Sequence, residues 1–288
     1  MFVPLIEPPA TVGPDCLVFA VAKHEVDIAR APQPEGGEFL GTLDGTLCWA
    51  VEVAEASSHL DLRRLWGMVD DETWAVASRA VQIVDWARTH RYCGSCGTPT
   101  EKSPGERARR CPECGLLAFP RIAPAVIVLI ERDDGRVLLA RNVNFPGSMF
   151  SCLAGFVEPG ENLEQAVVRE VREEVGIEIR DLEYFGSQPW PFPHSLMVGY
   201  RARYVSGEIV CEEAEIAEAA WFSADDLPAI PPAMSIARRL IDDWVRSRIL
   251  DPMPPTAVGV PAGAAAPGEK QRAPDRVDPN APATRRCG

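Results

Sequence analysis

The chain has 288 residues, a formal net charge of −13 at pH 7 and a pI of about 4.9. It is long enough for two modest domains with cores of their own. Its acidic balance excludes bulk electrostatic attraction to nucleic acid, which requires a basic surface. No apolar run is long enough to span a membrane, and Met1–Gly13 lacks the basic start and apolar core of a signal peptide. We therefore expect a cytoplasmic protein with no membrane partner.

Residues 1–90 have the pattern of a small α+β domain. Asp44-Gly45 separates two apolar runs and favours a tight hairpin turn. The expected elements are strands at Cys16–Ala22, Glu38–Leu43 and Thr46–Val53, and helices at Leu62–Trp66 and Glu72–Arg88. No cluster of ionisable groups with catalytic spacing occurs here, so we expect a scaffold or dimerisation role.

The nine cysteines are unevenly distributed, with four of them in two C-x-x-C pairs, each followed by glycine. Such knuckles bring four thiolates around Zn²⁺ in a tetrahedron, and with no position left for water the zinc is structural. The expected ligands, in a ribbon at 91–118, are Cys93, Cys96, Cys111 and Cys114. His90 is close enough to compete as a ligand. Arg107, Arg109 and Arg110 lie between the pairs and are more typical of a solvated surface than of a nucleic-acid site.

Residues 119–250 alternate strands and helices without regular βαβ repeats, which favours an α/β/α sandwich with a mixed sheet. The expected strands are Ala125–Glu131, Arg136–Ala140, Phe150–Phe156, Ile177–Phe185, Leu196–Tyr204 and one that begins at Trp221–Phe222, and the closing helix is Ala233–Arg248. Residues 251–288 are rich in Pro, Ala and Gly without an apolar period, and we expect a disordered tail.

Residues 161–175 predict an amphipathic helix, because apolar side chains recur every four residues from Leu163 to Val175. Glu170, Glu173 and Glu174 are three or four residues apart and share another face. Carboxylates at this density suit a hard cation, Mg²⁺ or Mn²⁺, which usually also binds substrate phosphates. The alternative is a solvated acidic face.

The stretch from Gly155 to Ile177 resembles the Nudix box, G-x5-E-x7-R-E-U-x-E-E-x-G-U with U aliphatic, and every fixed position matches. The resemblance implies the α/β/α sandwich and hydrolysis of a nucleoside diphosphate linked to another group. Glu170 and Glu174, one turn apart, are the expected principal metal ligands. Glu161 and Arg169 are expected to pair across loop and helix. The general base is Glu173 or Glu174, and the family adds the peptide oxygen of Ala154 as a ligand.

A second element, which begins eleven residues beyond Gly176, is Ser187-Gln-Pro-Trp-Pro-Phe-Pro-His-Ser195. Alternating prolines stiffen a segment into an extended form, so that its other side chains project at fixed positions for stacking and hydrogen bonding. The alternative is a proline-rich loop between strands. The segment resembles the S-Q-P-W-P-F-P-x-S array of the NADH pyrophosphatase branch of the Nudix family, which also carries a zinc ribbon before its catalytic domain.

That resemblance implies substrate contacts and one further metal ligand. The array contacts are Gln188, Pro189, Trp190, Pro191, Phe192, Pro193, His194 and Ser195. The other implied contacts are Glu106, Phe119 (where the family often has Tyr) and the backbone of Ala237. Glu215 matches the metal-binding glutamate outside the box, with Glu218 as the alternative. Phe156 is either a stacking residue or part of the core.

The expected activity is hydrolysis of NADH, and less readily NAD⁺, to AMP and nicotinamide mononucleotide, with removal of NAD caps from RNA 5′ ends. The family is typically a homodimer, in which Phe119 serves the partner's site. Three alternatives remain: a Nudix hydrolase for another nucleoside diphosphate derivative such as ADP-ribose, a non-catalytic nucleotide- or RNA-binding protein, and a ribbon that acts as a nucleic-acid adaptor.

Overall fold

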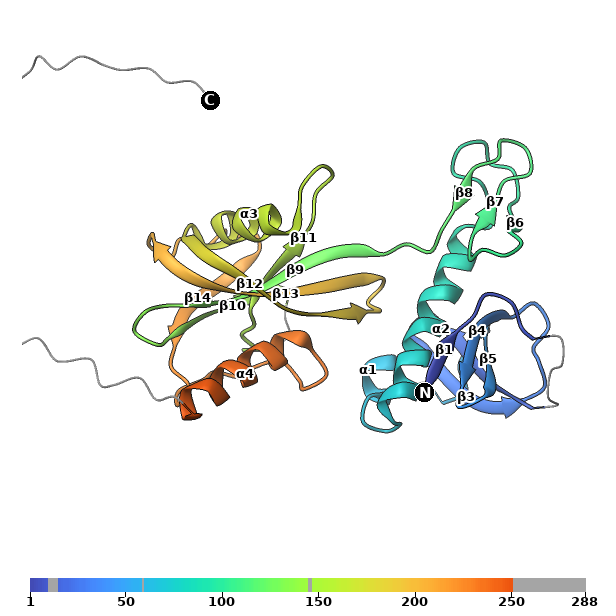
Figure 1. Cartoon of the computed structure of the whole chain (residues 1–288), viewed down its shortest axis with the longest axis horizontal. Helices are drawn as coiled ribbons and strands as arrows, with labels where there is room; N and C mark the ends of the chain where they lie inside the picture. The colour runs from blue at the N-terminus through green and yellow to red at the C-terminus, as the bar shows by residue number, and fades with distance from the viewer. Residues whose placement is uncertain (10–14, 59, 145–146, 251–288) are drawn as a thin grey trace, which may run out of the picture. The chain divides into compact units, whose positions relative to one another are not determined.

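The computed structural model describes residues 1–9, 15–58, 60–144 and 147–250 (Figure 1). The tail predicted at 251–288 lies outside the described residues. Within the described ranges, no helix combines the length and the apolar character that crossing a membrane requires. The described residues form three sheets, which the chain completes one after another.

The first sheet has the strand order β1-β4-β5-β2-β3, with β2 and β5 parallel and the other pairs antiparallel. Its strands are β1 (Phe2–Pro4), β2 (Cys16–Ala22), β3 (Glu25–Ala31), β4 (Glu38–Leu43) and β5 (Thr46–Glu52). The hairpin predicted at Asp44-Gly45 is confirmed, and both residues have positive φ angles. Strand β3 was not predicted, because its charged residues obscure the apolar pattern.

Two helices, α1 (Leu62–Leu65) and α2 (Asp71–Thr89), follow this sheet. The side chain of Asp70 caps α2 by accepting a hydrogen bond from the backbone N–H of Thr73. The apolar face of α2 packs on the sheet, and Ala77, Val81 and Val84 lie in the shared core. Helix α2 on this sheet confirms the expected small α+β architecture.

The second sheet belongs to the ribbon and consists of β6 (Glu101–Lys102), β7 (Arg109–Arg110) and β8 (Leu117–Ala118). Contacts with β4 hold it in place. Arg109 and Lys102 both pair with Glu38 at 3.1 Å, and Arg107 donates to the backbone carbonyl of Phe39 at 2.8 Å. The prediction that the loop arginines form a solvated surface is therefore wrong for Arg107 and Arg109. The same contacts leave these two side chains less available to nucleic acid.

The third sheet is mixed and has six strands, with the order β12-β13-β9-β10-β14 and with β11 paired to β9. The strands are β9 (Ala123–Glu131), β10 (Val137–Asn142), β11 (Leu153–Phe156), β12 (Glu178–Trp190), β13 (Ser195–Ser206) and β14 (Ile216–Phe222). β13 runs parallel to β9, and the other pairs are antiparallel.

One helix covers each face of this sheet, as Figure 1 shows for α3 (Leu163–Val175) and α4 (Ile236–Leu250). Alternate residues of β9 supply the two cores: Val126 and Val128 pack with α3, whereas Ile127 and Leu129 pack with α4. The α/β/α sandwich with a mixed sheet is thus confirmed.

Two strand boundaries predicted for this sheet need correction. Trp221–Phe222 ends β14 instead of beginning a strand, because the strand starts at Ile216. The strand expected at Phe150–Phe156 starts only at Leu153. The array is extended as predicted at Ser187–Trp190, which continue β12, whereas Pro191–His194 form a turn before Ser195 starts β13, so that the array is the end of a β-hairpin.

Candidate active site

The acidic helix α3 is fixed at both ends. Asn162 and Gln165 form a capping box, with the Asn162 side chain accepting from the Gln165 N–H at 2.8 Å and the Gln165 side chain accepting from the Asn162 N–H at 3.0 Å. Gly176 ends the helix with a left-handed φ of 72°, which glycine adopts without a steric penalty. In the apolar stripe Val167, Val171 and Val175 are fully buried, and Leu163 is half-buried. This anchoring presents the glutamates on another face.

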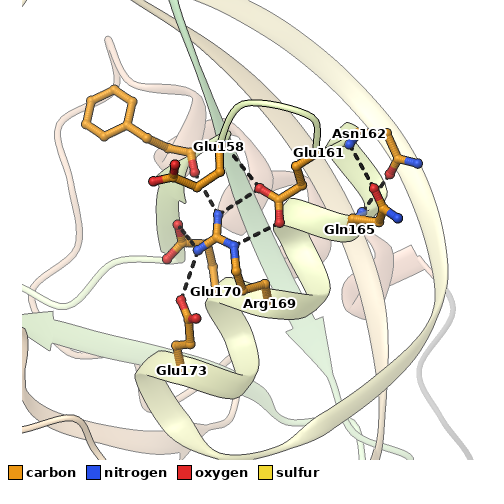
Figure 2. Close-up of polar contacts among 8 residues, drawn as sticks. Glu158, Glu161, Asn162, Gln165, Arg169, Glu170 and Glu173 are labelled. Atoms are coloured by element: carbon orange, nitrogen blue, oxygen red, sulfur yellow. Dashed lines mark hydrogen bonds and ion pairs between the residues drawn. The ribbon is translucent and has the colours of Figure 1, made fainter.

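Arg169 connects the loop before α3 to the glutamates of the helix (Figure 2). It donates two hydrogen bonds to Glu161, at 2.8 and 2.9 Å, and single ones at 2.9 Å to Glu170 and Glu173. A further hydrogen bond reaches the carbonyl oxygen of Phe156 at 2.9 Å. The guanidinium holds the pKa of Glu161 at about 2, so this carboxylate is ionised at any physiological pH.

Glu174 is the buried member of the acidic group, with 4% of its surface exposed. Its Oε2 is buried and has no hydrogen-bond partner among the described residues. Burial, with smaller contributions from the charges of Glu170 and Glu215, raises the pKa of Glu174 to about 8. Burial also raises the pKa of Glu170, against the opposing effect of Arg169. An orphaned buried carboxylate oxygen among like charges fits a bound cation.

Without a bound metal, the raised pKa of Glu174 makes the folded protein less stable near neutral pH. Because the folded state binds this proton more tightly than the unfolded state does, stability falls as the pH rises from 4.5 towards 8. A bound cation would favour the ionised carboxylate and remove that cost. The chemistry of the donor set, all hard oxygens, is that of Mg²⁺ or Mn²⁺.

The strand β11 lies directly against the Glu170 carboxylate. A Cβ placed on Gly155 would come within 1.9 Å of the Glu170 carboxyl carbon, so only glycine allows this approach. Ala154, the neighbouring residue in β11, is exposed. Ala154, whose peptide oxygen is a predicted ligand, is therefore adjacent in sequence to Gly155, which lies against the predicted ligand Glu170.

Of the two glutamates considered outside the box, Glu215 is electrostatically connected to the acidic group. Its charge contributes to the raised pKa of both Glu170 and Glu174. It immediately precedes β14, and its carbonyl oxygen accepts a hydrogen bond from the N–H of Val143 at 2.9 Å. Glu218 instead points towards Arg141 of β10, at 3.7 Å. This electrostatic connection favours Glu215 over Glu218 as the additional ligand.

The array lies near the box because both flank the start of β9. In the sheet, Ala125 is opposite Phe156 of β11 on one side and opposite Met197 of β13 on the other. Two strand spacings of about 4.8 Å therefore separate the end of β11 from the start of β13. The hairpin tip and the loop that leads to α3 share one edge of the domain.

Several array side chains are already engaged within the protein. The Gln188 amide donates to the carbonyl oxygen of Met234 at 2.6 Å and accepts from the N–H of Ile236 at 2.7 Å, which joins the hairpin to the start of α4. Phe192 packs against the N-terminal core, with the Arg63 guanidinium carbon 3.6 Å from its ring centroid. Trp190 packs edge-on to Phe192 at 5.1 Å.

The rest of the array differs in exposure. Pro191 and Ser195 are buried, whereas Pro189 and Pro193 are exposed. His194 is half-buried, and its carbonyl oxygen accepts from the N–H of Ala123 at 2.9 Å. Ala237 is buried in α4, next to the residue that Gln188 contacts. The described structure thus brings the array and Ala237 together.

The three remaining predicted substrate contacts, Phe156, Phe119 and Glu106, lie outside the hairpin and α4. Phe156 is 57% exposed, so its alternative role as a core residue is wrong. Phe119, between the ribbon and β9, is 54% exposed. Glu106 is exposed and lines a cavity of about 270 Å³ between the ribbon and β4, not the space around Gln188. Among the residues that the structure describes, no hydrogen bond or ion pair joins Phe119 or Glu106 to the array.

The four cysteines of the ribbon lie within 4.8 Å of one another. Three sulfur pairs, Cys93–Cys114, Cys96–Cys111 and Cys96–Cys114, are 3.5, 3.4 and 3.7 Å apart. Zinc–sulfur bonds of about 2.3 Å require edges close to these values in a tetrahedron, so the four thiolates fit structural zinc. His90 is not part of the group, because its Nδ1 lies 2.9 Å from the carbonyl oxygen of Trp86.

Two contributors to the site were not predicted from the sequence. Arg63 holds Phe192 from α1, more than 120 residues earlier in the chain, and no spacing rule connects the two. Gly155 was noted only as a fixed position of the box. Its signal was available, since a glycine in a strand often marks the close approach of another group.

Comparison with known proteins identifies two families along the chain. The NUDIX domain family matches residues 121–244, and the NADH pyrophosphatase zinc ribbon domain family matches residues 88–119. A protein of Deinococcus radiodurans named NAD-capped RNA hydrolase NudC is 44% identical over 80% of this chain and 88% of its own length. Proteins of the same name from Pseudomonas entomophila and Pseudomonas aeruginosa are 49% and 55% identical, over 73% and 62% of this chain and 78% and 64% of their own lengths.

This similarity, with the intact box and the helices on both faces of the sheet, shows that the chain belongs to the Nudix hydrolase family. Within that family it is similar to the members that carry the NADH pyrophosphatase zinc ribbon.

The zinc site generates a first prediction. Cys96→Ser should lower the zinc content below one ion per chain and lower the melting temperature by about 5 °C or more, because metal binding contributes to folding. Metal analysis and thermal unfolding measure both effects. Cys211→Ser, outside the knuckles, serves as the control and should retain zinc. Full zinc occupancy in Cys96→Ser would contradict the assignment.

Gly155 provides a second prediction. Gly155→Ala should displace the Glu170 carboxylate and reduce kcat by about tenfold or more, which corresponds to about 1.4 kcal/mol of activation free energy. Steady-state kinetics with circular dichroism separates this loss from unfolding. Gly186→Ala, where an added Cβ meets nothing within 4 Å, is the matched control. Equal losses in both variants would rule out a specific effect on Glu170.

The third prediction concerns protons. At pH 7 Glu174, with its pKa of about 8, is mostly protonated, so Mg²⁺ binding should release most of one proton. At pH 9 the release attributable to Glu174 should be nearly absent, and affinity should be higher. Calorimetry in two buffers of different ionisation enthalpy measures the release. In Glu174→Gln this contribution should be lost, and a release unchanged between pH 7 and pH 9 would disprove the linkage.

Proposed function

We propose that this chain hydrolyses the diphosphate bond of NADH and NAD⁺ to AMP and nicotinamide mononucleotide, and removes NAD caps from the 5′ ends of RNA. The observation that carries the proposal is the position of the complete array beside the complete box, on the two sides of the first residues of β9. The relatives named NAD-capped RNA hydrolase support the same substrates.

In this proposal Glu170, Glu174 and Glu215, with the peptide oxygen of Ala154, bind Mg²⁺ or Mn²⁺. Cations held by these residues would neutralise the diphosphate charge and favour deprotonation of the attacking water. Arg169 keeps the loop and helix at a fixed separation through its paired contacts with Glu161.

The general base accepts the proton of the attacking water, and two glutamates are candidates for it. Glu173 is exposed and linked to Arg169, whereas Glu174 is buried with an unpartnered oxygen. Separate replacement of each by glutamine, with rates measured across pH, distinguishes the two.

Substrate recognition is assigned to the hairpin and the start of α4. Trp190 and Phe156 offer aromatic faces to the bases, because neither ring is fully buried. Gln188 and Phe192 hold the hairpin in place through Ile236 and Arg63, so they preorganise the pocket as well as contacting the dinucleotide. The other array residues, and the backbone of Ala237, complete the assigned contacts.

We also propose the remaining features of the family for this chain. It forms a homodimer, in which the exposed Phe119 serves the partner's site, Glu106 is a further substrate contact, and the protein acts in the cytoplasm. Its parts are an N-terminal domain at 1–90, the ribbon at 91–118, the Nudix domain at 119–250 and a tail at 251–288. The first two parts share contacts through Glu38.

Product analysis tests the proposal. Purified protein with Mg²⁺ and NADH should yield AMP and reduced nicotinamide mononucleotide, identified by chromatography and mass spectrometry. Glu174→Gln should lose turnover by orders of magnitude while retaining its fold, because the cation site is then incomplete. A non-catalytic nucleotide-binding protein would bind NADH without any turnover, and cleavage of ADP-ribose in preference to NADH would disprove the assigned substrate.

A further inference from the structure

A cavity of about 630 Å³ lies beside the hairpin and is also lined by the N-terminal helix α2. Gln188 and Ser195 line it from the hairpin, and Trp74 and Arg79 line it from α2. The cavity therefore adjoins the proposed substrate contacts, although part of its wall comes from a region with no chemical assignment.

Arg79 is half-buried in this wall and lacks a counter-ion among the described residues. Its Nε is buried and has no hydrogen-bond acceptor in that part of the chain. Its nearest aromatic contact is the Phe2 ring, with 5.9 Å between the guanidinium carbon and the ring centroid. Burial lowers the pKa of Arg79, but a guanidinium remains charged at physiological pH. A buried charge without a partner is unfavourable, and a ligand anion would compensate it.

The rest of the lining is suited to a nucleotide. Arg239 of α4 is exposed and lines the same cavity, without an ion pair in the described part of the chain. One carboxylate, that of Asp71, lines it as well. Trp66 is half-buried there and presents an aromatic surface. Arginines beside aromatic rings are typical of sites for single-stranded nucleic acid.

The cavity and Ala154, a proposed cation ligand, lie at different positions along β9. Ser195 is opposite Ala123 at the start of β9, whereas Ala154 is opposite Ile127. Four residues of strand correspond to about 13 Å. The two phosphates of a dinucleotide are adjacent, so a diphosphate bound at α3 leaves the arginines free for a different phosphate.

We propose that Arg79 and Arg239 bind a backbone phosphate of the RNA that follows an NAD cap, with the Trp66 ring available to a base. This subsite rests on the proposed function and assigns it a preferred substrate class, the capped polymer. In a capped RNA the next phosphate is attached through the 3′ oxygen of the cap's adenosine, whereas free NADH has no phosphate there.

The test compares two substrates. Arg79→Met, which keeps the apolar stem, and Arg239→Ala should each reduce kcat/KM for a short NAD-capped RNA about tenfold, as expected for a charged hydrogen bond. Hydrolysis of NADH should change less than twofold. The dependence of log kcat/KM on log salt, measured with the capped RNA, should become shallower by about 0.7 for each phosphate that is no longer neutralised.

Arg88→Ala on α2 and Arg246→Ala on α4 are the matched controls, because both side chains pair with surface aspartates. Equal losses on NADH and capped RNA in both Arg79→Met and Arg239→Ala would overturn the subsite, as would unchanged kinetics. If Arg79→Met does not fold, the exposed Arg239 decides the question. A wild-type protein that cleaves NADH but not capped RNA overturns only this inference, whereas one that cleaves neither overturns the proposed function as well.

Discussion

The pairing of Arg169 with the surrounding oxygens is the interaction on which the rest of the site depends. It supports three carboxylates and the carbonyl of Phe156 with one guanidinium, so that the acidic face of α3 remains helical despite its like charges. Because the pKa of Glu161 is held at about 2, this connection persists at every physiological pH. The loop, β11 and α3 are thereby joined through one side chain.

The start of β9 provides the second constraint, because it lies between the strand that leads to the acidic helix and the strand that begins with the last residue of the array. Its antiparallel partner β11 leads to α3, and its parallel partner β13 begins with the last residue of the array. A shift of either register by one residue would turn the side chains of that strand to the opposite face. The buried alternation of Val126 and Ile127, against α3 and α4, prevents such a shift.

The N-terminal domain contacts the hairpin and contributes to the cavity beside it. Its contacts with Phe192 anchor the hairpin, and α2 lines the cavity beside it. Most strands and α2 of this domain could be predicted from sequence, since Asp44-Gly45 and the apolar period of 72–88 are local signals. The roles of its side chains could not be predicted, because Arg63 and Arg79 acquire their significance only from residues more than 100 positions away. The same holds for Phe192, which was expected to project at a fixed position for contact with substrate and which packs against the N-terminal core.

The sequence by itself determined the acidic helix with its stripe, the four-thiolate knuckles and the presence of the array, because each depends on spacing within fewer than 25 residues. Only the tertiary structure decided that the array is a hairpin end, that Phe156 is exposed and that Arg107 and Arg109 hold the ribbon to β4. It also decided that the charge of Glu215 acts on Glu174, whereas Glu218 lies beside Arg141. The physical reason is that periodicity reports which face of an element is buried, whereas strand pairing and packing between distant segments determine what that face meets.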